Sequence, residues 1–267
     1  MTKIAIVGAS GRMGRVLAQA ISVDNGATLT AAVDRLDGDA VGCDMGQIAG
    51  IGYNNVIVGT SLLDVIDNVD VVIDFSSPLA TAQHADLCSR HGKNLVIGTT
   101  GLTSEQIQCI TAASEYISIC MSSNFAMGVN LCFKLAEIAA SALGDDVDIE
   151  ISEAHHKHKL DAPSGTALTL GGVVARALDR DLDKVAVYQR QGEVGVRDSK
   201  AIGFSSVRAG DIVGDHTVMF SGHGERIEIT HRASNRMAFA KGAVRAAKWL
   251  SGQDSGLFDM QDVLELK

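Results

Sequence analysis

The sequence predicts an α/β protein with two domains, a doubly wound parallel sheet and a second α+β domain with an open mixed sheet. In the first half, short apolar runs rich in β-branched residues alternate with longer helical patterns, as expected of parallel strands joined by crossover helices. Beyond about residue 130 this alternation gives way to two helices and several closely spaced β-rich runs. With 267 residues, 46% of them hydrophobic, the chain is long enough for two cores.

Five strands are expected in the first domain, each followed by Gly, Ser, Thr or Asp. Parallel strands end at one edge of a sheet, so a ligand is expected to bind in the loops that follow them. The five runs are residues 4–7, 29–33, 69–74, 94–97 and 117–121.

The chain is expected to close with a helix over residues 236–250, in which Met237, Ala240, Val244 and Ala247 recur at helical spacing. The second domain is expected to hold two helices, one ending near residue 143 and one over about 164–178, and strands at residues 147–152, 185–189, 201–207, 217–221 and 227–231.

Composition excludes several classes of protein. A formal charge of −9 argues against nonspecific binding to nucleic acid or a membrane surface, since both need a broad basic face. The five cysteines are odd in number and form no CxxC spacing, so we expect neither a disulfide framework nor structural zinc, and a reducing cytoplasm fits best. The N-terminal apolar run is too short for a signal peptide, and no other segment is expected to reach the length of a membrane span.

The stretch IAIVGASGRMGRVLAQAI predicts a dinucleotide site. Gly8, Gly11 and Gly14 lie where a strand turns into a helix, so that the backbone can approach a pyrophosphate and the helix N-terminus can supply amide donors. The spacing GxxGxxG departs from GxGxxG by one residue, and a tight turn without a ligand is the alternative. The context of strand, glycine turn and helix indicates a Rossmann-like domain.

Asp34 closes the second strand 20 residues after Gly14, where a carboxylate can accept hydrogen bonds from a ribose diol. Arg35 follows it and could instead meet a 2′-phosphate, so the choice between NADH and NADPH stays open. For either residue alone, a solvated strand end is the alternative.

Two further loops are expected to bind the dinucleotide. GTTG follows the fourth strand and SSNFAMG follows the fifth, which places small residues and hydroxyl groups at the same sheet edge. Phe125 in the second loop either faces a nicotinamide ring or belongs to the core.

Residues 150–167, EISEAHHKHKLDAPSGTA, place three histidines and two lysines in five consecutive positions just before a helix entrance. Histidine exchanges protons near neutral pH, lysine pairs with carboxylates or donates a proton, and the helix start offers backbone donors. Extended alternation would place His155 with Lys157 and Lys159, although this phase is unreliable past the strand end. The stretch therefore predicts an anion site with proton-transfer groups.

A zinc site and a solvated basic turn are the alternatives. Adjacent histidines point apart in a strand, no HExxH or CxxC accompanies them, and the lysines would repel a dication, so no metal is expected. The helix entrance PSGT argues against a merely solvated turn.

These motifs resemble the dihydrodipicolinate reductase (4-hydroxy-tetrahydrodipicolinate reductase) family. Its pattern E-[IV]-x-E-x-H-x-x-x-K-x-D-x-P-S-G-T-A is met at every fixed position of residues 150–167. GASGRMG, DFSSP, GTTG and SNFAMGVN also match in order and spacing, so the resemblance covers essentially the whole chain.

The resemblance implies an enzyme that uses NADH, NADPH or both to reduce a cyclic dicarboxylate, 4-hydroxy-tetrahydrodipicolinate via dihydrodipicolinate, to tetrahydrodipicolinate in the diaminopimelate route to lysine. Hydride would come from nicotinamide C4. The implied acid/base residue is His155, the implied proton donor is Lys159, and His156, Gly165 and Thr166 would hold the substrate carboxylates. The implied dinucleotide residues are Gly8, Ala9, Ser10, Gly11, Arg12, Met13, Asp34, Arg35, Gly98, Thr99, Thr100, Ser122, Ser123, Asn124 and Phe125.

The resemblance also implies a domain organisation. Residues 1–126 and 236–267 would form the dinucleotide-binding domain, and residues 127–235 a domain that binds substrate and assembles a cytoplasmic homotetramer. Three alternatives stay open: a nicotinamide-binding sensor without turnover, a zinc-dependent hydrolase, and a reductase of another small dicarboxylate or imine.

Overall fold

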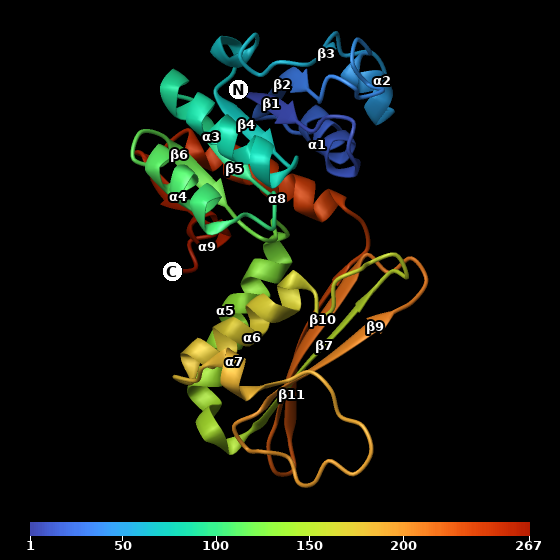
Figure 1. Cartoon of the computed structure of the whole chain (residues 1–267), viewed down its shortest axis with the longest axis vertical. Helices are drawn as coiled ribbons and strands as arrows, with labels where there is room; N and C mark the ends of the chain where they lie inside the picture. The colour runs from blue at the N-terminus through green and yellow to red at the C-terminus, as the bar shows by residue number, and fades with distance from the viewer. The chain divides into compact units, whose positions relative to one another are not determined.

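The computed structural model describes residues Met1–Lys267, and the chain forms two compact units. Unit 1 comprises Met1–Met127 and Arg236–Lys267, and unit 2 comprises Gly128–Asn235. In Figure 1 the blue-to-green and red parts of the chain belong to unit 1, and the light-green-to-orange part belongs to unit 2. The chain therefore passes between the units twice.

Unit 1 contains a sheet of seven parallel strands in the order β12-β6-β5-β4-β1-β2-β3. The predicted doubly wound parallel sheet is confirmed. Two strands were missed, β3 and the edge strand β12, which the C-terminal segment adds beside β6. The strands are β1 Thr2–Val7, β2 Ala27–Val33, β3 Val58–Gly59, β4 Val71–Asp74, β5 Asn94–Ile97, β6 Ser118–Met121 and β12 Gly256–Phe258.

The buried strands of this sheet present apolar side chains to both faces, because successive side chains point to opposite faces. Helices cover both of these apolar faces. In β1, Ile4 and Ile6 pack into one apolar cluster, whereas Ala5 and Val7 pack into the other. The C-terminal helix α8 lies beside α1 and buries the predicted stripe on the first of these clusters. The helices of unit 1 are α1 Arg12–Ser22, α2 Met45–Ala49, η1 Ile66–Asn68, α3 Pro78–His91, α4 Ser104–Ala113, α8 Met237–Leu250 and α9 Met260–Val263.

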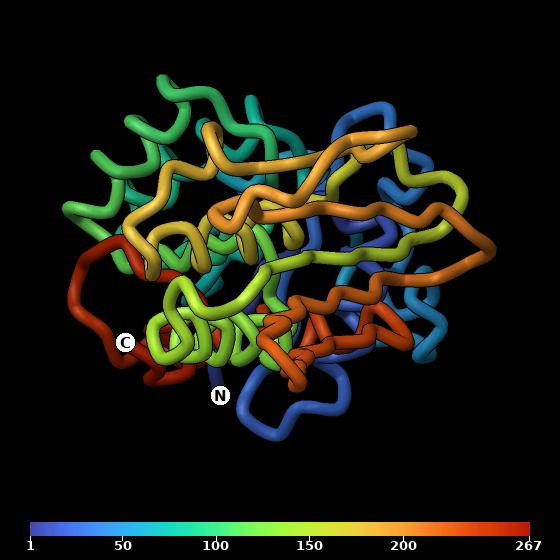
Figure 2. The backbone as a smooth tube through the Cα atoms, turned by 90° about the horizontal axis from the view of Figure 1, so that it is seen from below, coloured from blue at the N-terminus to red at the C-terminus, as the bar shows by residue number.

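Unit 2 contains a mixed sheet of five strands in the order β11-β10-β7-β9-β8, which confirms the predicted class (Figure 1, Figure 2). β10 pairs antiparallel with β7 and β11, while β9 pairs parallel with β7 and β8. The strands are β7 Asp148–His155, β8 Ala186–Val187, β9 Ile202–Arg208, β10 Gly214–Ser221 and β11 Arg226–Ala233; the helices are α5 Met127–Leu143, η2 Gly144–Asp146, α6 Gly165–Ala177 and α7 Leu182–Val185.

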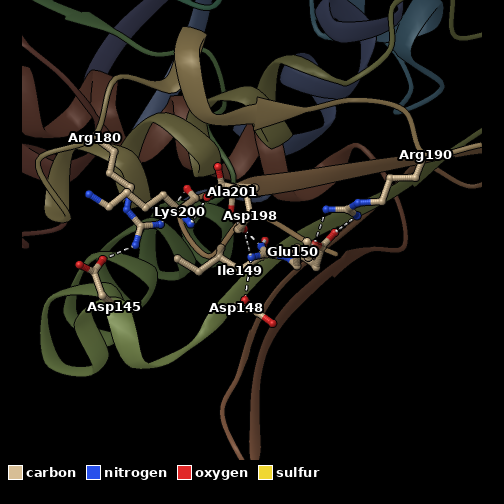
Figure 3. A network of polar contacts seen from close by, with 10 residues as sticks. Asp145, Asp148, Ile149, Glu150, Arg180, Arg190, Asp198, Lys200 and Ala201 are labelled. Carbon is tan, nitrogen blue, oxygen red and sulfur yellow. Dashed lines mark hydrogen bonds and ion pairs between the residues drawn. The ribbon is translucent and has the colours of Figure 1, made fainter. Parts of the chain in front are cut away.

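The two faces of this sheet differ. On the inner face, which packs against α6, apolar residues fill the middle of β7 and β10, and polar residues occupy the end of β7. On the outer face, Glu150 receives two hydrogen bonds of 2.8 Å from Arg190 (Figure 3). It receives a third, of 3.1 Å, from Arg197. Arg197 also donates to Asp148 at 2.7 Å and to backbone carbonyls. These contacts fix the long segment 188–201 onto the outer face.

Helix α5 and the turn after it differ from the expectation that no segment is long and apolar enough to span a membrane. The 20-residue segment Met127–Asp146 contains an 18-residue stretch with a mean hydropathy of 1.2 and is long and apolar enough to cross a membrane, so the expectation that no segment reaches that length is wrong. A single helix of this kind is a weak sign, because core helices pass the same test. α5 buries one stripe that includes Val129 and Phe133, and carries an ion pair of 3.2 Å between Lys134 and Glu137. Such charges are rare within membrane-spanning helices.

Candidate functional sites in the two units

The glycine turn after β1 has the backbone that a pyrophosphate site requires. Gly8 has φ of +75°, and a Cβ atom at Gly14 would lie 2.4 Å from the carbonyl oxygens of Gly8 and Ala9. α1 begins at Arg12, and its N-cap, Gly11, provides no side-chain acceptor for the first amide groups. These amides therefore suit an anionic ligand, so the residues present fit a dinucleotide.

Asp34 is tied to the glycine turn. Its carboxylate accepts the backbone N–H of Ser10 at 2.5 Å and that of Arg35 at 2.8 Å. Burial alone would raise the pKa of Asp34, but the hydrogen bonds from Ser10 and Arg35 outweigh it and hold the pKa below its usual value. The Ser10 side chain also hydrogen-bonds this carboxylate, which still has acceptor capacity that fits a ribose hydroxyl.

A pocket of about 310 Å³ opens beside this carboxylate and is lined by Ser10, Arg15, Arg35, Asp37, Gly38, Asp39, Ala40, Cys43 and Ile48. Arg35 forms an ion pair of 3.2 Å with Asp37, and its side chain is 77% exposed. Two guanidinium groups can meet a 2′-phosphate here, while Asp34 can meet a free ribose, so the structure leaves both cofactors open.

A second, more apolar pocket of about 230 Å³ lies in the same unit, lined by Met13, Phe75, Ser123, Asn124, Phe125, Arg236 and Phe239. The rings of Phe75 and Phe125 lie 5.7 Å apart, centre to centre. Phe125 is 1% exposed and is part of the core as well as of the pocket wall. A Cβ atom at Gly98 would lie 2.1 Å from the Phe75 ring, so this loop position needs glycine.

The buried carboxyl group of Asp74, at the end of β4, organises the loops around Phe75. It accepts the N–H of Ser76 at 2.9 Å and the hydroxyl of Ser76 at 2.6 Å, and it lies 2.7 Å from Nδ1 of His84 on α3. The Thr99 hydroxyl faces the same group at 3.5 Å and accepts a hydrogen bond from Thr81 at 2.8 Å. Thr99 therefore uses its hydroxyl inside the protein, whereas Thr100 is exposed. The predicted roles of Ser122 and Ser123 stay predictions.

In unit 2, the polar site grows from β7, which continues to His155 and is three residues longer than predicted at this end. Glu153 and His155 therefore both point to the inner face. The register aligns Glu153 with His216 on β10, which in turn faces His231 on β11. On the other side, His155 is paired with Arg208 on β9. The sheet thus places five ionisable side chains in two adjacent cross-strand rows. One row holds Glu153, His216 and His231, and the other holds His155 and Arg208.

His155 is held by a buried carboxylate. Its Nδ1 lies 2.6 Å from Glu153 Oε2, and Arg208 donates two hydrogen bonds of 2.8 Å to the same carboxylate. Burial would raise the pKa of Glu153, but the hydrogen bonds from Arg208 and His155 lower it to about 2. Burial lowers the pKa of His155 below its usual value, although Glu153 acts in the opposite direction.

A second histidine lies against the first. The rings of His155 and His216 meet edge to face with centres 5.0 Å apart, and Nε2 of His216 is 2.8 Å from the Ser164 hydroxyl. Burial, with a further contribution from His155, lowers the pKa of His216 to about 4. From the sequence, Glu153 was included only as a fixed position of the family pattern, without a role. Arg208 and His216 were missed, although a histidine at an inward position of an otherwise apolar strand was a signal.

The loop after β7 carries the remaining predicted residues. The predicted alternation ends at His155, because Lys159 N–H donates to the His156 carbonyl at 3.1 Å and closes a tight turn. The Lys159 ammonium pairs with Asp161 at 2.9 Å and acts electrostatically on His155. Nδ1 of His156 is buried without a hydrogen-bond partner.

The predicted helix entrance is present. α6 begins at Gly165, and its N-cap Ser164 accepts the N–H of Ala167 at 3.2 Å. A Cβ atom at Gly165 would meet nothing within 4 Å, so the backbone there is open to a ligand, and Thr166 follows it in the first turn. No group of three or more His, Cys, Asp or Glu side chains is arranged to hold a metal ion.

Known proteins match the chain along its whole length. The family models described as dihydrodipicolinate reductase, N-terminus and C-terminus, match residues 2–125 and 128–264. A 4-hydroxy-tetrahydrodipicolinate reductase from Alkalilimnicola ehrlichii is 57% identical over 265 residues, 99% of each chain. A dipicolinate-bound dihydrodipicolinate reductase from Paenisporosarcina sp. TG-14 has a TM-score of 0.78 and 27% identity, and 98% of each chain is covered.

More distant structures share the fold. GenD2 from gentamicin A biosynthesis, solved in complex with NAD, has a TM-score of 0.61 and 18% identity, with 99% of this chain and 90% of that chain covered. A probable dehydrogenase from Thermotoga maritima also has a TM-score of 0.61, with 14% identity and coverage of 99% and 93%.

Proposed function

The chain belongs to the dihydrodipicolinate reductase family, and from this premise we propose the roles of its residues in the reaction. It is an oxidoreductase that uses NADH or NADPH to reduce 4-hydroxy-tetrahydrodipicolinate, via dihydrodipicolinate, to tetrahydrodipicolinate in the diaminopimelate route to lysine. The observation that best supports the residue roles is the buried Glu153–His155 pair beside Lys159 at the end of β7.

Unit 1 is the dinucleotide-binding domain in this proposal. The turn of residues 8–13 holds the pyrophosphate, and Asp34 with Arg35 meets the adenosine ribose or its phosphate. Residues 98–100 and 122–125 surround the nicotinamide half, beside the pocket between Met13 and Phe125. When bound, the reduced nicotinamide supplies hydride from C4.

Unit 2 is the substrate-binding domain. Gly165 and Thr166 at the start of α6 and the unpartnered Nδ1 of His156 bind the carboxylates of the substrate. Hydride addition leaves electron density on the substrate that must be protonated. Lys159 delivers this proton. His155 takes part through a hydrogen bond of its Nε2, because its Nδ1 is already bound to Glu153.

We also propose that the protein is a cytoplasmic homotetramer assembled through unit 2. Val194 and Val196 on the segment fixed to the outer face are largely exposed, as is Val207 on β9, and a subunit interface would cover such residues. Light scattering should give close to four times the chain mass of 28.0 kDa.

The function is tested by following oxidation of NADH and NADPH with substrate freshly generated by the preceding synthase. The wild type should turn over, and His155→Ala should lower kcat by about 10² to 10⁴ with cofactor affinity retained. His158→Ala is the matched control, because His158 is an exposed histidine of the same loop. Cofactor binding without oxidation by the wild type would instead favour the sensor.

A further inference from the structure

Glu153 is a buried carboxylate that lies 2.6 Å from Nδ1 of His155, and the proposed reaction gives it no role of its own. We propose, on the basis of the proposed function, that Glu153 is a positioning residue: anchored by Arg208, it holds the His155 ring with Nδ1–H toward itself and Nε2 toward the substrate. It acts through His155 and touches no reacting atom.

The hydrogen bonds of Glu153 fix which nitrogen of His155 carries the proton. Oε2 lies 2.6 Å from His155 Nδ1 and accepts from Arg208 at 2.8 Å, while Oε1 accepts from Arg208 at 2.8 Å and from the Ser164 N–H at 3.3 Å. An ionised carboxylate only accepts, so the proton in the short contact belongs to Nδ1. The neutral ring therefore keeps its lone pair on Nε2.

Arg208 links this pair to the loop that carries Lys159. Besides clamping Glu153, it donates to the carbonyl of Asp161 at 2.6 Å and to that of Val207 at 2.7 Å. Asp161 in turn holds the Lys159 ammonium at 2.9 Å. One guanidinium thus sets the positions of both the histidine and the loop of the proton donor.

The surroundings of the ring leave it one orientation. His216 packs edge to face against it. Gly214 lies next to Nε2, and only a residue without a side chain leaves enough space there for the ring. If the ring were turned over, a C–H group would face the Glu153 carboxylate in place of Nδ1–H. Because Glu153 is only 3% exposed, no water would replace the lost hydrogen bond.

The charge of Glu153 also supports the protonated form of His155. Burial, Lys159 and Arg208 lower the pKa of His155, and Glu153 raises it. Replacing Glu153 by glutamine should therefore move the fall of kcat/KM that follows His155 deprotonation to lower pH. The charged and titratable groups facing the ring are Glu153, Arg208, Lys159 and His216.

The chain offers a matched control on the same strand. Glu150 also belongs to β7 but lies on the outer face of the sheet, where Arg190 clamps its carboxylate (Figure 3). Arg197 donates a further hydrogen bond to the same carboxylate. Glu150→Gln removes a carboxylate from an arginine clamp without touching His155, so it reports the general cost of such a loss.

The experiment compares Glu153→Gln and Glu150→Gln by steady-state kinetics at saturating cofactor and by ¹⁵N NMR of the histidine rings. Glu153→Gln should lower kcat by roughly 10- to 100-fold, shift the pH profile, leave NADH affinity unchanged and abolish the fixed Nδ1–H signal of His155. Glu150→Gln should do none of these. Arg208→Lys is the second variant should Glu153→Gln not fold. It keeps the positive charge but loses the paired hydrogen bonds of the guanidinium to Glu153, so it should show a smaller fall in kcat and a smaller shift of the pH profile.

Two results would overturn the proposal. One is a neutral wild-type His155 ring that carries its proton on Nε2 and not on Nδ1, and the other is a Glu153→Gln enzyme whose kcat and pH profile equal those of Glu150→Gln. If the wild type shows no turnover, the proposed function fails, whereas the NMR comparison still decides the positioning of His155.

Discussion

Gly214 and Nε2 of His155 approach so closely that a Cβ atom added to the glycine would lie 3.0 Å from that nitrogen. Gly214 begins β10 and directly precedes Asp215, which pairs with Ala154 on β7, so it lies beside the end of β7 that carries His155. The absence of a side chain at this position is therefore part of how the ring is placed.

Gly214→Ala is expected to displace the His155 ring by a few tenths of an ångström and to lower kcat by about tenfold, because proton transfer depends steeply on geometry. Gly222→Ala, just past the other end of β10, is the control, since its Cβ would make only an ordinary contact of 3.5 Å with Val147. The kinetics of both variants check this, and equal kcat values would contradict the proposed crowding.

The buried His216 should make stability depend on pH. Its pKa of about 4 in the folded protein lies below the usual 6.5, so the unfolded chain binds the proton first as pH falls. Stability is therefore full above pH 6.5 and declines between pH 6.5 and 4, by up to roughly 3 kcal/mol at about 1.4 kcal/mol per pKa unit. Glu153, with its pKa lowered to about 2 from 4.5, adds a separate loss between pH 4.5 and 2.

Urea unfolding at several pH values measures this dependence. His216→Gln should flatten the slope between pH 6.5 and 4, whatever its effect on stability at pH 7. His223→Gln, at an exposed turn between β10 and β11, should leave the slope as in the wild type. A slope that His216→Gln does not change would assign the acid sensitivity to another group.

His84 should matter for cofactor binding although it lies on α3. His84→Leu removes a partner of the buried Asp74, which costs about 1–3 kcal/mol, and loosens the loops of Phe75 and Thr99. The expected result is a lower melting temperature together with several-fold weaker NADH binding. His91→Leu is the control, because His91 is the last residue of the same helix and pairs with the exposed Asp67. If NADH binding weakens equally in both variants, Asp74 does not organise the site.

The sequence was most informative where local pattern and packing agree. The five central strands β1, β2, β4, β5 and β6 of unit 1 and the stripe of α8 were predicted because apolar periodicity reports burial directly. β12 was missed because a three-residue edge strand has no periodicity and exists only through its pairing with β6.

The candidate site in unit 2 shows the same limit. His155 and Lys159 follow from a local motif, whereas the contacts of Arg208 and His216 depend on the register of three strands far apart in sequence. The geometry of the loop after His155 was not predicted either, because the turn at His156 ends the extended alternation, whose phase is unreliable past a strand end.

The division of unit 1 along the chain has a consequence for the order of folding during synthesis. Residues 128–235 are continuous, so unit 2 has all its strands as soon as β11 leaves the ribosome. The first 127 residues lack α8, whose buried face includes Ala243 and Leu250, and also lack the edge strand β12. The domain that starts first is therefore completed last, and its apolar face stays open until the final 32 residues arrive.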